Sequence, residues 1–387
     1  MEKQKIENLV SARQNNCIIC SKLLTEKIKL DEYPITEMYE DYEKDFSDWG
    51  YLDQSLMHCV NCNHYSLSKV LDVDYIYKNY LTTSSSSYGA IRCLENFSKF
   101  IKKEIIPDIS NLTFIDVGGN DSYLLEKINC RRKINIDINA SGKKEIELIK
   151  TKVEDVDYKS FKNSKKVYLS SHTLEHCQNP NIVLEKISDS MNDDDQLFVQ
   201  VPSIELLINQ LKFEQICHQH LHYFSLDSLK LLLDSKNLDL LNYEYDEDHF
   251  GTIRVSCKKK GNNSILKKKN IQSSVCEEKF NIFKKYMRSI NEIVSDGMVG
   301  FGAGLMVPTL KYYVPNLQKL EVIYDENESK NNKRYLNMNV RITSENSFLR
   351  DHDVIVTSIT TKYSARKILE KLLNLEAKNI IFPTMYI

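Results

Sequence analysis

Short apolar runs alternate with amphipathic runs between residues 111 and 258, and this alternation is typical of a parallel β-sheet whose strands are joined by helices. The apolar runs predict strands at Phe114–Val117, Lys133–Ile136, Lys166–Ser170 and Gln196–Val201. Strand and helix signals alternate again from Met298 onward, after a lysine-rich stretch from Lys258 to Asn270 that is typical of a linker. The pattern therefore predicts an α/β protein with a second, smaller α/β domain toward its C-terminus.

The length of the chain also favours several domains. Its 387 residues exceed the number that one hydrophobic core usually serves, which is roughly 250–300. We place a cysteine-containing module at residues 1–75, the main α/β domain at 76–260 and the smaller domain at 261–387. The sequence leaves open whether the protein is a monomer or a homodimer.

Charge and hydropathy exclude several functions. A net charge of -2 provides no overall field that would attract nucleic acid or an anionic membrane, so we expect neither as a partner. The charged N-terminus lacks the apolar segment of a signal peptide, and no run approaches the roughly 18 apolar residues that cross a bilayer. We therefore expect a cytoplasmic protein whose ten cysteines are reduced.

Four cysteines form two Cys-x-x-Cys pairs: Cys17, Cys20, Cys59 and Cys62. In a reducing compartment such pairs are typical metal ligands, and four thiolates complete the tetrahedral shell of a structural Zn²⁺ ion. His58 and His64 flank the second pair, so a site of three cysteines and one histidine is an alternative, and four unrelated cysteines are another. The twin spacing favours the zinc site with four thiolates.

A strand, a tight turn of small residues and a helix follow one another where the main sheet begins. The predicted helix is Ser122–Lys127, and the next strand ends at Asp137, about twenty residues past the glycines, where a carboxylate can accept both hydroxyls of a ribose. Acidic and amide groups in the turn suit the cationic amino-acid end of S-adenosylmethionine (SAM) better than a pyrophosphate; a turn without a ligand is the alternative. The candidate SAM-binding residues are Asp116, Gly118, Gly119, Asn120, Asp121 and Asp137.

The most unusual segment holds three alternating histidines and two aromatic residues: His218, His220, His222, Tyr223 and Phe224. Imidazole is the natural proton acceptor near neutral pH, and methyl transfer from a sulfonium needs a nucleophile whose proton a base has removed. His176 follows the fourth predicted strand, so we expect it near the ligand crevice, with local packing as the alternative. For the histidine run, a metal site and a hydrogen-bonded polar core are the alternatives.

The order of these motifs resembles the sugar-nucleotide C-methyltransferases of deoxysugar biosynthesis over nearly the whole chain. The stretches that carry the resemblance are the two Cys-x-x-Cys pairs, Phe114–Asp121, Thr173–His176, Ile216–Ser225, His249–Val255, and Gly300–Ala303 with Asp325. That family has an N-terminal zinc-binding domain, a central class I SAM methyltransferase domain and a C-terminal Rossmann-like domain. The resemblance implies the same three domains here, with the last one binding substrate.

The resemblance also implies an enzyme that transfers a methyl group from SAM to a sugar nucleotide or a related carbohydrate. His220 would be the base, His176 would lie by the substrate, and Tyr77 or Tyr80 would reach the sugar. His218 and Tyr223 complete the candidate catalytic group. C-methylation next to a keto group and O- or N-methylation both remain open.

The chain departs from the family pattern where substrate is expected. Cys217 replaces a tyrosine, and Gln219 replaces the glutamate between two histidines, so that an amide stands where a carboxylate could carry charge. Ser122 replaces the last glycine of the SAM turn, and Met306 replaces a lysine at the start of a helix.

Two other functions stay open. The turn Gly300–Gly304, with Asp325 about twenty residues further on, is similar to the cofactor turn of an NAD(P)-dependent oxidoreductase, although it lacks the final glycine of that motif. A non-catalytic homologue is the other alternative, because Gln219 removes a carboxylate from the expected active site.

Overall fold

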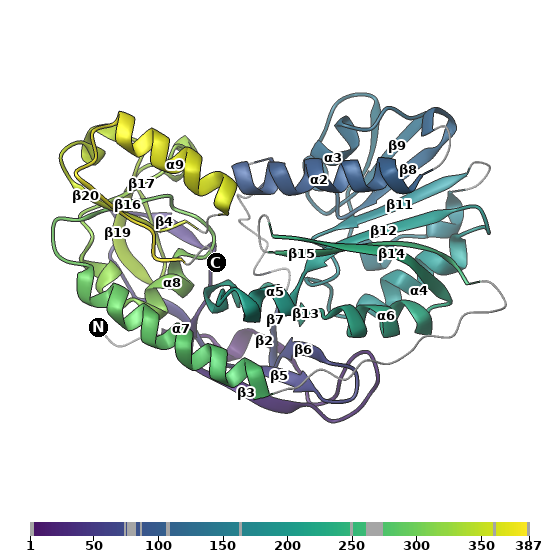
Figure 1. The fold of residues 1–387 in the computed structure, drawn as a ribbon, viewed down its shortest axis with the longest axis horizontal. Helices are drawn as coiled ribbons and strands as arrows, with labels where there is room; N and C mark the ends of the chain where they lie inside the picture. The colour runs from purple at the N-terminus through teal and green to yellow at the C-terminus, as the bar shows by residue number, and fades with distance from the viewer. Residues whose placement is uncertain are drawn as a thin grey trace.

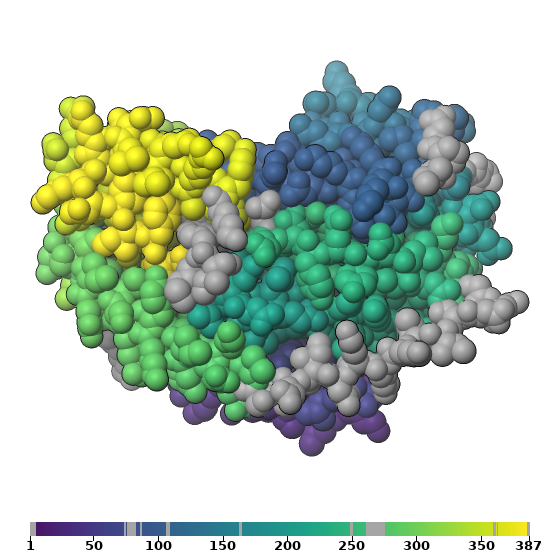
Figure 2. Space-filling model, in the orientation of Figure 1, coloured from purple at the N-terminus to yellow at the C-terminus, as the bar shows by residue number. Residues whose placement is uncertain are grey.

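The computed structural model describes residues 4–72, 75, 83–85, 87–105, 109–161, 165–247, 251–260, 274–358 and 361–384. Three large β-sheets and the helices around them form this part of the chain (Figure 1). In the space-filling view the N-terminal residues lie along the lower edge, beneath the regions that carry the other two sheets (Figure 2).

The main sheet contains the four strands predicted from the apolar runs. Its spatial order is β10 (Ile146–Ile149), β9 (Arg132–Ile136), β8 (Thr113–Val117), β11 (Lys166–Ser171), β12 (Gln196–Pro202), β15 (Thr252–Lys259) and β14 (Leu238–Asp246). The first five strands are parallel, and β15 is antiparallel to both of its neighbours. The strand order reverses between β8 and β11, and ligands of such sheets bind at the carboxyl ends of the strands beside that point.

Helices cover both faces of the main sheet. One face carries α2 (Tyr88–Glu104) and α3 (Tyr123–Glu126), and the other carries α4 (Pro180–Ser190) and α6 (Leu226–Ser235). The start of α4 agrees with the sequence, because Asn179 accepts a hydrogen bond from the main chain of Asn181 and Pro180 occupies the first turn. Val183, Leu184 and Ile187 then face the sheet and are buried, which fixes how this helix packs.

A second sheet lies beside the main one. Its spatial order is β21 (Asn379–Ile381), β20 (Asp353–Val356), β16 (Val299–Phe301), β17 (Ile323–Tyr324), β19 (Met338–Thr343), β18 (Lys333–Tyr335) and β4 (Tyr39–Asp41). The first five strands are parallel, and their chain order reverses between β16 and β20, as it does in the main sheet. The neighbouring helices are α7 (Ser274–Ile293), α8 (Val307–Tyr313) and α9 (Lys362–Asn374). The domain boundaries at residues 75 and 260 stay predictions.

The N-terminal region is built into the rest of the protein. Its sheet contains β1 (Gln4–Lys5), β3 (Thr25–Pro34), β5 (Trp49–Cys59), β6 (His64–Leu67) and β13 (His222–Tyr223), and β2 (Val10–Arg13) pairs with β7 (Lys69–Leu71). Strand β13 belongs to the histidine segment, whereas β4 leaves the N-terminal region and joins the second sheet. One apolar core runs from β3 through α5 (Ile204–Asn209) and α7 to the second sheet. The N-terminal strands therefore hold the histidine segment in place.

Among the described residues, none of the helices combines the length and the apolar character that a bilayer crossing requires.

Candidate active site

The turn between β8 and α3 adopts backbone conformations that favour small residues. Gly118 has a φ of +83°, and a Cβ added to it would lie 2.1 Å from Oγ1 of Thr173. A Cβ on Gly119 would lie 2.5 Å from Oδ1 of Asn135. Ser122 stands where the resembling family has glycine, and its φ of 62° explains that preference. Its hydroxyl donates to a main-chain carbonyl at 2.6 Å, which stabilises the serine in this conformation.

Asp137 is tied to the glycine turn at the end of β9. Its Oδ2 accepts a hydrogen bond from the main-chain N–H of Asn120 at 3.2 Å, and its Oδ1 accepts one from Asn139 at 2.7 Å. On the other side of the turn, Asp121 accepts hydrogen bonds from the N–H and the hydroxyl of Ser85, at 2.9 and 2.6 Å. The structure thus brings the predicted SAM-binding residues together at the ends of two adjacent strands.

Asp116 is the buried acid of this group. Asp116 is 2% exposed, and its Oδ1 has no hydrogen-bond partner among the described residues. Burial, together with the carboxylates of Asp137 and Asp121, raises the pKa of Asp116 to about 8. A cation bound beside it would favour the ionised form, so this corner of the site suits a positively charged group.

The side chains of the three alternating histidines face three different surroundings. His218 is buried, and its Nε2 lies 3.2 Å from the carbonyl oxygen of Tyr33. The Nδ1 of His222 lies 3.2 Å from Nε2 of His64. His220 instead lines a large cavity. Within the described residues the histidine run therefore does not form one metal-binding group.

His176 and His220 meet at the cavity wall. Their ring centroids are 4.8 Å apart and the rings are nearly perpendicular, at 77°. The Nδ1 of His176 lies 2.9 Å from the carbonyl oxygen of Gln219, and we assign the Nδ1–H tautomer from this contact. Burial lowers the pKa of His176, so its neutral form is favoured at pH 7.

Glu175 was not among the predicted site residues. One of its carboxylate oxygens lies within 4.8 Å of a ring nitrogen of His176 and of His220. Its place directly before His176, at the end of a buried strand and turn, was the signal in the sequence that could have indicated it.

A cavity of about 1100 Å³ joins the ends of the two larger sheets. The predicted residues that line it are Asp116, Gly118, Gly119, Asn120, Asp137, His176 and His220. Gly302, Asp325 and Lys330 line it from the second sheet. The candidate SAM-binding turn, the two histidines and the second glycine turn thus face the same space.

Two predicted catalytic residues, His218 and Tyr223, do not line the cavity. His218 contacts the N-terminal strands, and the hydroxyl of Tyr223 accepts a hydrogen bond from the main-chain N–H of Cys217 at 3.0 Å. Both residues support the backbone behind His220. The predictions for Tyr77 and Tyr80 concern positions outside the described residues.

Gln219 also has a structural contact. Its Nε2 donates to the carbonyl oxygen of Thr36 at 3.0 Å, and the Thr36 hydroxyl donates to its Oε1 at 2.7 Å. Both ends of the amide are therefore used to fix the histidine segment to the N-terminal region, and a carboxylate at this position could not make the first of these bonds.

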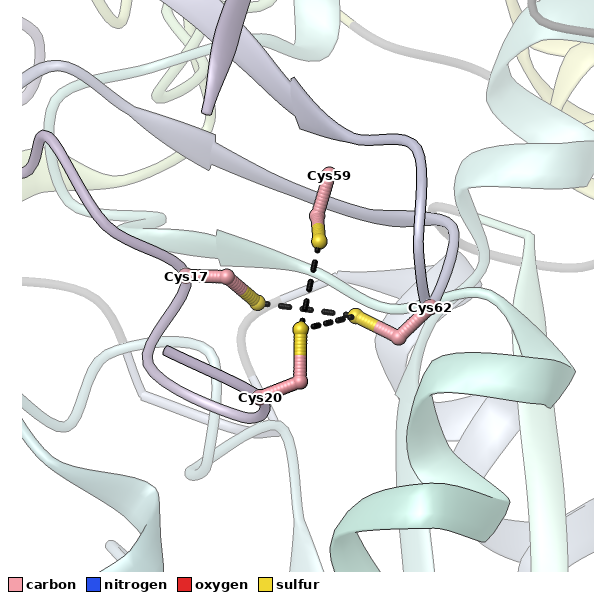
Figure 3. A group of neighbouring side chains, drawn as sticks. All are labelled: Cys17, Cys20, Cys59 and Cys62. Carbon is pink, nitrogen blue, oxygen red and sulfur yellow. Dashed lines mark hydrogen bonds between the residues drawn. The ribbon is translucent and has the colours of Figure 1, made fainter. Parts of the chain in front are cut away.

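The four cysteines of the two Cys-x-x-Cys pairs converge on one point (Figure 3). Sulfur–sulfur distances are 3.5 Å for Cys17 and Cys62, 3.4 Å for Cys20 and Cys59, and 3.7 Å for Cys20 and Cys62. All four are unbridged. The contact with the Cys62 sulfur is the main reason why the pKa of Cys17 is lowered.

The histidines beside the second cysteine pair face away from this cluster. Nε2 of His58 lies 3.0 Å from Oδ1 of Asn63, and Nε2 of His64 contacts His222. The arrangement agrees with the four-thiolate set rather than with a set of three cysteines and one histidine.

The second glycine turn follows β16. Gly302 has a φ of +93°, the main-chain N–H of Ala303 donates to Oδ2 of Asp325 at 2.7 Å, and Lys330 donates to the carbonyl oxygen of Ala303 at 2.8 Å. This arrangement repeats that of Asn120 and Asp137 in the main sheet. The turn faces the shared cavity, so it is a second wall of one site.

Comparison with known proteins identifies the main sheet. A family described as "Methyltransferase domain" matches residues 91–243, which include the glycine turn, Asp137, His176 and His220. This segment is a methyltransferase domain. It contains the strands β8 to β12 and most of β14.

Individual proteins match the chain over shorter stretches or at low identity. C-methyltransferase NovU from Streptomyces niveus is 36% identical over 73 residues, which are 19% of this chain and 17% of that protein. A chain in the complex of the Haloferax volcanii Trm112 methyltransferase activator with a methyltransferase is 13% identical, with a TM-score of 0.36 over 46% of this chain and 96% of its own. N-methyltransferase NodS from Bradyrhizobium japonicum, solved with S-adenosyl-L-homocysteine, is 9% identical, with a TM-score of 0.33 over 46% and 90%.

Proposed function

We propose that this protein is a SAM-dependent methyltransferase that acts on a sugar nucleotide, with His220 as the base. The observation that carries the proposal is that His176 and His220 line the same cavity as the turn Asp116–Asn120 and Asp137. A methyl donor held at the turn and an acceptor beside the histidines would share that space.

The residues around the turn fit SAM. Asp137 would accept hydrogen bonds from the ribose of SAM. Each of its oxygens accepts one main-chain hydrogen bond and keeps a further lone pair for a ribose hydroxyl. Asp116 offers a buried oxygen without a partner to a cationic amino-acid group, and the two glycines leave room for close approach of a ligand. SAM, when bound, supplies a methyl group on a positively charged sulfur.

The histidines provide the base chemistry. His220 accepts the proton of the acceptor group, whose electron pair then becomes available to form the new bond to carbon. His176 packs edge-on against His220, and its contact with the carbonyl oxygen of Gln219 keeps the pair aligned. Because His220 is buried and His176 is half-buried, water competes poorly for the position of the acceptor.

The opposite wall supports a nucleotide-linked acceptor. Lys330, Lys367 and Lys371 line the cavity from the second sheet and α9, and a diphosphate bound there would compete with Asp325 for Lys330 and with Glu326 for Lys371. Phe301 and Tyr324, with ring centroids 5.6 Å apart, offer apolar surface for a base. The volume of about 1100 Å³ exceeds what one small ligand requires. The partial match to C-methyltransferase NovU supports C-methylation next to a keto group as the reaction we propose.

Mass spectrometry tests this function. The protein is incubated with SAM that carries a ¹³C-labelled methyl group and with nucleotide sugars that do or do not contain a keto group. We expect the label in a keto-containing nucleotide sugar, and NMR of the product locates the methylated atom. Label on oxygen or nitrogen would correct the proposed atom, whereas transfer to none of the nucleotide sugars would contradict the proposed substrate class.

We also propose that the cysteine cluster holds a structural zinc ion. The sulfur–sulfur distances of 3.4 to 3.7 Å are close to the edge of a zinc tetrathiolate tetrahedron, which is about 3.8 Å for Zn–S bonds of about 2.3 Å. Zn²⁺, when bound, would cross-link β5 and the loop around Cys17. Because β13 pairs with β6, the ion would also stabilise the strand next to His220.

Removal of the metal should destabilise the protein. We expect elemental analysis to find one zinc per chain. After chelation we expect Tm to fall by roughly 10 °C, which corresponds to a loss of about 3–5 kcal/mol of stability in a domain of about 150–250 residues. Cys20→Ser should lower the zinc content, while Cys130→Ser, whose sulfur contacts the carbonyl oxygen of Arg132, should not. Zinc-free protein with an unchanged Tm would refute the structural role.

A further inference from the structure

Glu175 is a buried carboxylate that accepts no hydrogen bond through its side chain among the described residues. The residue is 0% exposed. Burial raises the pKa of Glu175 to about 7. Its main-chain carbonyl accepts hydrogen bonds from Leu221 at 2.8 Å and His222 at 3.2 Å, so Glu175 is joined to the histidine segment by its backbone. A buried carboxylate whose oxygens accept no hydrogen bond costs stability, so a role other than stabilising the fold is the better explanation for it.

Imidazole rings surround this carboxylate. Nδ1 of His172 lies 3.2 Å from Oε1, but burial and the Arg254 cation lower the pKa of His172 to about 3, so this ring is neutral at pH 7. Ring nitrogens of His176 and His220 lie within 4.8 Å of a Glu175 oxygen. If a histidine at the cavity wall is protonated, the ring that pairs with the Glu175 carboxylate is therefore that of His176 or His220.

Other titratable groups also face Glu175. They are His172, His176 and Cys177 on its own segment, and Cys217, His220 and Tyr223 on the segment that packs against it. Burial raises the pKa of Cys217 to about 12 and raises those of Cys177 and Tyr223 well above their usual range. These three groups are neutral at pH 7, so the histidine pair is left as the titrating partner.

We propose that Glu175 is a positioning residue for the base: its carboxylate pairs with the imidazolium that forms when His220 accepts a proton, and it orients the His176–His220 pair for that step. An imidazolium in this buried wall would otherwise be destabilised by desolvation. The proton leaves the acceptor, rests on the histidine pair beside Glu175 and passes to solvent after product release, so Glu175 undergoes no net change. The effect on turnover rests on the proposed function, whereas the pairing itself does not.

Histidine NMR with a pH titration tests the pairing. The S-adenosylhomocysteine complexes of wild type, Glu175→Gln, Glu175→Asp and Glu214→Gln are labelled with ¹⁵N-histidine, and the signals of His176 and His220 are assigned by substitution. Glu214 is the matched control, because it is 1% exposed, both of its oxygens lack partners among the described residues, and burial raises its pKa to about 7 as well. It does not belong to the Glu175–His176–His220 group.

In wild type we expect the histidine pair to take up one proton, at a pH below the ordinary pKa of histidine because burial disfavours the charged ring. Glu175→Gln should shift this uptake to lower pH, lower kcat by about 10-fold or more, leave KM for SAM unchanged and move the acid limb of the kcat profile in the same direction. Glu175→Asp should restore part of each effect, and Glu214→Gln should change none. If Glu175→Gln does not bind S-adenosylhomocysteine, Glu175→Asp is compared with wild type instead.

Unchanged histidine titrations in the Glu175 variants, or the same changes in Glu214→Gln, would overturn the proposal. The titration requires no acceptor. Absence of methyl transfer by wild type would therefore refute the proposed function while leaving the pairing of Glu175 to be decided by the NMR result.

Discussion

His220→Ala is expected to lower methyl transfer by about 10²- to 10⁴-fold, the range that a general base contributes, while the affinity for S-adenosylhomocysteine stays close to that of wild type. His220 lines the cavity beside His176, whereas the candidate donor-binding residues lie on β8 and β9. Removal of the imidazole therefore takes away the proton acceptor and leaves the turn intact. Single-turnover kinetics with labelled SAM measure the loss.

His218 provides the comparison for this variant. Nε2 of His218 contacts the carbonyl oxygen of Tyr33, and Nδ1 lies 3.4 Å from Nε2 of Gln54, so both ring nitrogens face the N-terminal strands. His218→Ala should lower stability and have the smaller effect on the rate of the folded protein. If His218→Ala abolishes turnover while His220→Ala does not, the assignment of the base is wrong.

Gly118→Ala is expected to destabilise the protein and to abolish detectable binding of S-adenosylhomocysteine. A side chain at a φ of +83° costs about 1–2 kcal/mol of backbone strain. The new Cβ would also lie 2.1 Å from Oγ1 of Thr173, which donates to the carbonyl oxygen of Val117 at 2.9 Å and cannot move without losing that bond. Such overpacking adds about 1–3 kcal/mol and displaces the turn from the cavity.

Gly297→Ala is a matched control for the strain. Gly297 has a similar φ of +80°, but a Cβ there meets no atom within 4 Å. We expect it to lower the free energy of unfolding by the strain alone, about 1–2 kcal/mol, and to leave ligand affinity unchanged. Chemical denaturation and calorimetry measure the two quantities. Equal effects of the two substitutions would show that the close contact with Thr173 does not matter.

The sequence predicted the local features of the main sheet because local patterns determine them. Apolar runs gave β8, β9, β11 and β12 nearly to the residue, and the small residues after β8 indicated the turn. Asp137, which directly follows β9, was found in the same way, since parallel strands bring their carboxyl ends to one edge. The Cys-x-x-Cys spacing likewise predicted a cluster that the structure contains.

Contacts between distant segments were not predictable in the same way. An alternating His-x-His-x-His run predicts three side chains on one face of a strand. In the structure, His222 alone of the three lies in β13, and the backbone around His218 and His220 forms a turn. The pairing of Gln219 with Thr36 joins residues 183 positions apart. Glu175 became notable because tertiary packing buries it beside two histidines, and no sequence period encodes that contact.

Calorimetric titration of the wild-type protein with S-adenosylhomocysteine tests the central claim most directly, namely that the turn after β8 and Asp137 hold the methyl donor. We predict saturable binding of one molecule per chain and, because the ligand binds the native state, a rise in Tm, with neither effect for NADH. Binding of NADH without binding of S-adenosylhomocysteine would contradict the account and would favour an oxidoreductase that uses the turn after β16.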